Sequence, residues 1–93
     1  DIFARYGGEE FVIIFVDIKK DNSAKIVKRI KEEIEALNFK YKKNEIKITF
    51  SAGISDIDDL NLRTITDQNL FNTADRRLYI AKESGRNLIV IEG

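Results

Sequence analysis

The chain has 93 residues, 43% of them hydrophobic and 34% charged, so it is long enough for one small globular domain and no more. Its 16 basic residues balance 16 acidic residues, which gives no general reason to expect binding to a nucleic-acid polymer or a membrane surface. Cysteine and histidine are both absent, which excludes disulfides, thiol nucleophiles and the usual zinc sites. Any bound metal must therefore be held by carboxylates, which favour hard cations such as Mg²⁺.

The first elements predict a β-hairpin. Residues 2–6 are typical of a short strand, and Gly7 and Gly8 then mark a tight turn, because glycine adopts positive φ without strain. A second strand is expected over residues 11–18. Its apolar core, residues 11–16, shows no alternation, so it requires cover on both faces; it is also too short to span a bilayer.

A helix is expected next, over residues 23–37, with Asn22 or Ser23 as its N-cap. Its apolar stripe has helical spacing and consists of Val27, Ile30, Ile34 and Leu37. Residues 40–44 are basic and polar and are interpreted as a connector. Residues 45–55 alternate strictly, which predicts one strand whose inner face carries Ile46, Ile48, Phe50, Ala52 and Ile54.

The last third of the chain predicts a loop, a helix and a strand. After an acidic loop at residues 56–66, Thr66 or Asp67 should cap a helix that runs to about Ser84, with a buried stripe of Phe71, Ala74, Leu78 and Ala81. Gly85 stands where a glycine would end that helix, and residues 87–92 form the final strand. The order β-β-α-β-α-β predicts a single α+β domain over residues 1–93, with helices packed on one sheet.

The hairpin tip carries the pattern with the clearest chemical meaning. Gly7 and Gly8 would let the backbone approach a ligand closely, and the adjacent Glu9 and Glu10 offer oxygen ligands for a divalent cation that could bridge phosphate oxygens. A solvated turn kept soluble by its charge is the alternative interpretation. Composition alone favours that alternative, because paired glycines and paired glutamates are common on protein surfaces.

The segments at residues 5–11, 48–55 and 74–87 together resemble those of the GGDEF family, the diguanylate cyclases. Residues 5–11 (RYGGEEF) are similar to the family signature in its Glu form, and residues 48–55 (ITFSAGIS) to the strand that precedes the closing helix. Residues 74–87 (ADRRLYIAKESGRN) look like the closing helix itself. The segments occur in the family's order and cover nearly the whole chain. The resemblance implies a ferredoxin-like, palm-type fold, a cytoplasmic location, and condensation of two GTP molecules into cyclic di-GMP with release of pyrophosphate.

The same resemblance implies a role for each matching residue. Glu9 would coordinate Mg²⁺ (or Mn²⁺) and act as the general base for the 3′-hydroxyl, and Glu10 would add a metal contact. Gly7 and Gly8 would admit the substrate. Lys82 and Arg86 match the family's phosphate-binding cations. Without the resemblance, Lys82 would be interpreted as offsetting the helix dipole and Arg86 as a solvated turn residue.

The resemblance also implies that these 93 residues do not include the family's N-terminal strand and helices. Those elements carry a metal-binding aspartate and the pair of residues that recognises guanine. Asp1 would be the last residue of an inhibitory cyclic di-GMP site. Catalysis would need a homodimer, since each domain binds one GTP. We therefore expect the 93 residues alone to be inactive and to have an incomplete sheet, which closes differently or is completed by a second chain. The alternative function is a non-catalytic module that binds GTP or cyclic di-GMP.

Overall fold

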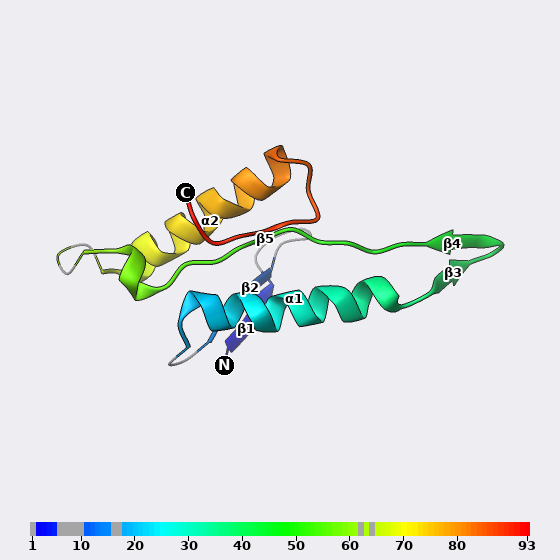
Figure 1. The fold of residues 1–93 in the computed structure, drawn as a ribbon, viewed down its shortest axis with the longest axis horizontal. Coiled ribbons are helices and arrows are strands. Elements are labelled where there is room, and N and C mark those ends of the chain that lie inside the picture. The colour runs from blue at the N-terminus through cyan, green and yellow to red at the C-terminus, as the bar shows by residue number, and fades with distance from the viewer. Residues whose placement is uncertain (1, 6–10, 16–17, 62, 64) are drawn as a thin grey trace.

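The computed structural model describes residues 2–5, 11–15, 18–61, 63 and 65–93. Its helices are α1 (Lys20–Ala36), the short 3-10 helix η1 (Ile57–Asp59) and α2 (Asp67–Glu83). Its strands are β1 (Ile2–Arg5), β2 (Phe11–Ile14), β3 (Phe39–Tyr41), β4 (Asn44–Ile46), β5 (Ala52–Gly53) and β6 (Ile89–Val90) (Figure 1). The prediction of a small α+β chain with two main helices is confirmed.

The expected single sheet is wrong for the described residues, which form three separate two-stranded sheets. β1 and β2 pair antiparallel from Ile2 opposite Ile14 to Arg5 opposite Phe11, which confirms the strands of the predicted hairpin. β5 and β6 pair in parallel, an arrangement that requires a long crossover, and the connection between them contains α2. The third sheet is a hairpin of β3 and β4.

The start of α1 differs from the prediction. The helix begins at Lys20, and Ser23, the expected cap, lies buried inside it. Lys19 occupies the N-cap position, but its side chain makes no hydrogen bond that caps the helix. The free backbone N–H of Lys20 instead donates to Oδ2 of Asp56 at 2.8 Å, so a carboxylate 36 residues away caps the helix and complements its dipole.

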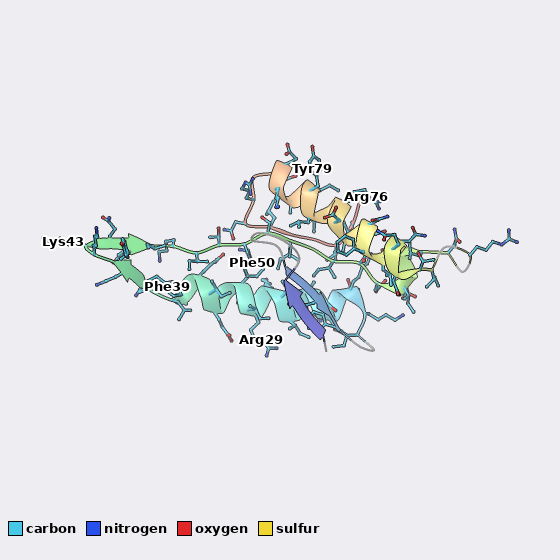
Figure 2. All side chains as sticks on the ribbon, turned by 180° about the vertical axis from the view of Figure 1, so that it is seen from behind. Arg29, Phe39, Lys43, Phe50, Arg76 and Tyr79 are labelled. Atoms are coloured by element: carbon cyan, nitrogen blue, oxygen red, sulfur yellow. The ribbon has the colours of Figure 1, made fainter. Side chains whose placement is uncertain are left out.

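The strand predicted over residues 45–55 is divided in two. Residues 44–46 turn back on β3, with Phe39 opposite Ile46, through a turn in which Lys42 has φ of +59°. Because residues 44–46 pair locally with β3, they do not continue into one strand with β5 (Ala52–Gly53). Ile46 and Ile48 are 42% and 41% exposed, so the alternation did not produce a covered face at these positions. The expected polar connector at residues 40–44 is part of this hairpin, which projects from one end of the elongated molecule with Lys43 at its tip (Figure 2).

The strands β5 and β6 lie between the two helices (Figure 1). Gly53 permits the close approach of α2, because a Cβ at this position would lie 2.1 Å from the carbonyl oxygen of Ala74. Among the described residues, the buried hydrophobic side chains are Val27 of α1 and Ala81 of α2. Figure 2 shows Tyr79 on the outer side of α2, where it is exposed. Neither main helix in the described part of the chain combines the length and apolarity needed to cross a membrane.

The predicted boundaries of α2 are close to the observed ones. Thr66 is the N-cap, and its Oγ1 accepts a hydrogen bond from the backbone N–H of Asn69 at 3.0 Å. Ala81 of the predicted stripe is fully buried, and its other three members are half-buried. The helix ends at Glu83, followed by Gly85 with φ of +115°, so the predicted glycine stop is confirmed.

Candidate functional site

The C-terminal end of α2 presents the two predicted phosphate-binding cations. Lys82 lies in the last helical turn and is half-buried, and Arg86 lies beyond the helix and is exposed. The backbone N–H of Arg86 donates to the carbonyl oxygen of Ala81 at 2.9 Å, the bond that closes a Schellman motif around Gly85. The helix end is therefore well defined, and it places both cations within one short stretch of chain.

The turn that carries Arg86 has an unusual backbone. Gly85, Arg86 and Asn87 have φ values of +115°, +63° and +56°, so three consecutive residues occupy the left-handed half of φ space. For a residue with a Cβ, that region costs roughly 1–2 kcal/mol. The backbone N–H of Asn87 donates to Oγ of Ser51 at 2.9 Å, which ties this turn to the segment leading into β5. The residues that follow Ser51 and Asn87 are also joined, by a hydrogen bond of 2.8 Å from Ala52 N–H to the Leu88 carbonyl oxygen.

The other predicted site residues lie outside the described residues. These are Asp1, Gly7, Gly8, Glu9 and Glu10. The register of β1 and β2 ends with Arg5 opposite Phe11, so residues 6–10 connect the two strands. The structure thus describes both strands that flank the predicted turn, and the roles of the turn residues stay predictions.

An ionic cluster that the sequence interpretation missed joins both helices to η1. Both terminal nitrogens of Arg77 donate to the Asp59 carboxylate, at 2.8 and 2.9 Å, and Lys20 Nζ lies 2.7 Å from the same carboxylate. The side chains of Arg77 and Asp59 are only 5% and 8% exposed. The Arg77 guanidinium holds the pKa of the Asp59 carboxyl well below its usual range, although burial acts in the opposite direction.

This cluster had a signal in the sequence. Arg77 falls three residues after Ala74 and four before Ala81, so it shares the inward face of α2 with the predicted apolar stripe. An arginine at an inward position requires a buried partner, and the acidic segment at residues 56–59 was one candidate source of that partner.

The described carboxylates do not form a metal site. Among residues 2–5, 11–15, 18–61, 63 and 65–93, no group of three or more candidate ligands is placed to hold a metal ion. The acidic segment has other partners: Asp56 accepts from the backbone of Asp58 and Lys20, Asp58 pairs with Lys19, and Asp59 pairs with Arg77. The metal ligands that the resemblance implies, Glu9 and Glu10, fall outside the described part of the chain.

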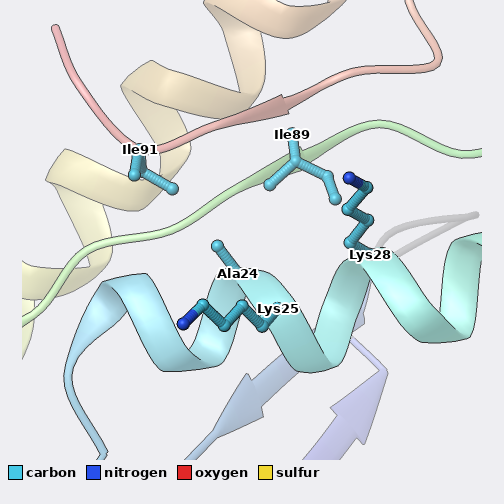
Figure 3. A pocket seen from close by; sticks show the side chains of 5 residues that line it. All are labelled: Ala24, Lys25, Lys28, Ile89 and Ile91. Carbon is cyan, nitrogen blue, oxygen red and sulfur yellow. The ribbon is translucent and has the colours of Figure 1, made fainter.

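A pocket between α1 and β6 is separate from the candidate cations. Figure 3 shows its lining side chains, which are Ala24, Lys25, Lys28, Ile89 and Ile91. It contains neither Lys82 nor Arg86, so it is not the site that the sequence predicted.

Comparison with known proteins assigns the family. The model of the family described as "Diguanylate cyclase, GGDEF domain" matches residues 1–88, which include the 5–11 signature and both candidate cations. The chain belongs to the GGDEF family.

Curated relatives cover the same stretch. The chain is 30% identical over 91 residues to Diguanylate cyclase A of Treponema denticola and 33% identical over 93 residues to the probable diguanylate cyclase DgcT of Escherichia coli. It is 34% identical over 92 residues to the response regulator PleD of Caulobacter vibrioides. These matches cover 97–98% of this chain, but 24% of the first relative and 20% of the other two. The chain therefore spans a quarter or less of the length of these relatives.

Proposed function

We propose that this chain is part of a diguanylate cyclase domain, which condenses two GTP molecules into cyclic di-GMP and releases two pyrophosphates. The observation that carries the proposal is the continuous family match over residues 1–88, in which the 5–11 signature and the Lys82 and Arg86 region both fall. The relative from Treponema denticola is named as a diguanylate cyclase. In this proposal the domain has the family's palm-type fold and works as a homodimer in the cytoplasm.

Glu9 is the proposed general base. It would accept the proton of the 3′-hydroxyl of one GTP, whose oxygen attacks the α-phosphorus of the other GTP while the bond to pyrophosphate breaks. Glu9 and Glu10 are hard oxygen donors of the kind Mg²⁺ or Mn²⁺ prefers; they would hold the ion, which neutralises phosphate charge when bound. Gly7 and Gly8 would let the triphosphate approach the backbone.

Lys82 and Arg86 are the proposed partners of the phosphate oxygens. Arg86 is exposed directly after a defined helix end, and its guanidinium could bind two oxygens at once. Lys82 stands one turn earlier. Asp1 is proposed as part of an inhibitory site for the product, in keeping with its place six residues before Gly7.

The test uses the protein expressed from its complete gene, with GTP and Mg²⁺, and chromatographic measurement of cyclic di-GMP. Glu9→Gln should lower kcat by at least about 100-fold, the usual contribution of a general base. Arg86→Ala should raise the KM for GTP, whereas Arg63→Ala, which removes an exposed arginine outside the site, should change neither constant.

Two outcomes would change the conclusion. A wild-type protein that binds GTP or cyclic di-GMP without turnover would support the alternative of a non-catalytic binding module. A protein that binds neither nucleotide would refute both functions.

A further inference from the structure

The segment around β5 holds α2 and the turn after it at three points on one face. Ser55 Oγ donates to the carbonyl oxygen of Leu70, in the first turns of α2, at 2.7 Å. Gly53 lies against the middle of the helix, since a Cβ there would be 2.2 Å from the backbone nitrogen of Leu78. Ser51 Oγ accepts from Asn87 N–H, beyond the helix end. Positions 51, 53 and 55 are two residues apart, the spacing at which extended chain presents side chains on one face.

The contact of Ser51 differs from the other two because its partner belongs to the strained turn. Arg86 and Asn87 both carry positive φ, and such residues persist only where the surrounding structure holds them. Arg86 N–H donates to Ala81, which lies in the last turn of the same helix. Asn87 N–H donates to Ser51, which lies in a separate segment of the chain. Ser51 therefore constrains the backbone immediately after Arg86.

We propose that Ser51 is a positioning residue for Arg86: its hydroxyl holds Asn87 so that the turn keeps Arg86 in its left-handed conformation and its guanidinium in place for the phosphates of GTP. This inference rests on the proposed function for the role of Arg86. In this proposal Ser51 acts through the turn and makes no contact with the nucleotide. Its loss should weaken the ground-state binding of GTP and leave the chemical step nearly unchanged.

The matched control is Ser55, which makes a hydrogen bond of similar length to the other end of the same helix. In the protein expressed from its complete gene, Ser51→Ala should speed amide exchange at Asn87 about fivefold, which corresponds to the loss of one ordinary hydrogen bond. The KM for GTP should rise by a similar factor, about fivefold, while kcat stays within about twofold. Ser51→Thr keeps the hydroxyl and should restore both values. Ser55→Ala should lower the melting temperature without moving either readout.

Equal effects of Ser51→Ala and Ser55→Ala on exchange and KM would overturn the proposal, because Ser51 would then act only through the stability of α2. Unchanged exchange at Asn87 in Ser51→Ala would overturn it too. If Ser51→Ala speeds exchange at Asn87 as expected, but the wild-type protein neither binds nor converts GTP, the result would support the contact of Ser51 with the turn. It would refute the proposed function instead.

Discussion

Replacing Asp59 by asparagine tests how much the ionic cluster contributes to stability. The carboxylate accepts from Lys20 and Arg77 on Oδ1, and from Arg77 and the backbone N–H of Asp56 on Oδ2. An asparagine has nearly the same shape as the aspartate, but its amide NH₂ would face two hydrogen-bond donors. The substitution also removes the negative charge, which would leave the Arg77 guanidinium buried without this counter-ion. Removing one partner of a buried ion pair costs about 3–5 kcal/mol.

That loss is large for a chain of this length, since small domains have roughly 0.05–0.15 kcal/mol of stability per residue. Urea unfolding followed by circular dichroism measures it directly. Asp58→Asn is the control, because its pair with Lys19 is about two-thirds exposed and should contribute little. A loss below about 1 kcal/mol for Asp59→Asn would refute the reasoning. Replacing both Asp59 and Arg77 by leucine should cost less than Asp59→Asn alone.

Three further predictions follow from the same packing. The pKa of Asp59 is lower in the folded state, so its carboxylate stabilises the fold above the unfolded pKa of about 3.9 and loses that contribution as the pH falls below this value. Acid unfolding curves should show this loss of stability, and Asp59→Asn should abolish it. Thr66→Ala should lower the free energy of unfolding in urea by about 1 kcal/mol, because it removes the cap on Asn69 N–H; an unchanged unfolding midpoint would contradict this. Gly53→Ala should displace α2 from Ala74 and lower the melting temperature by several degrees, which unchanged calorimetry would contradict.

Local signals predicted the elements that depend on local chemistry. The glycine at position 85 and the threonine at position 66 define the ends of α2 through bonds within a few residues, so the sequence was sufficient there. The start of α1 was predicted wrongly because its cap, Asp56, is remote in the sequence. The hairpin of β3 and β4 was missed because its turn residues are lysines, which carry no turn preference of the kind that glycine or asparagine has.

For the candidate site, the positions of the two cations could be predicted from the sequence, but the backbone conformation around Arg86 could not. Helical spacing and the glycine stop placed Lys82 and Arg86 correctly at the end of α2. The left-handed backbone at Arg86 and Asn87 was not predicted, and the hydrogen bond from Asn87 N–H to Ser51 joins this turn to a residue 36 positions earlier in the sequence. Arg77 was overlooked because the buried face of α2 was assigned from its apolar residues alone.

The remote cap of α1 has a consequence for the order of folding. Residues 20–36 leave the ribosome well before Asp56, so the first turn of α1 has no carboxylate partner until the segment through η1 is made. We expect this turn to form late, with contacts of high sequence separation that are absent from the transition state. Asp56→Ala should then speed unfolding and leave the refolding rate nearly unchanged in stopped-flow measurements. Slower refolding would instead show that the acidic segment meets the helix early.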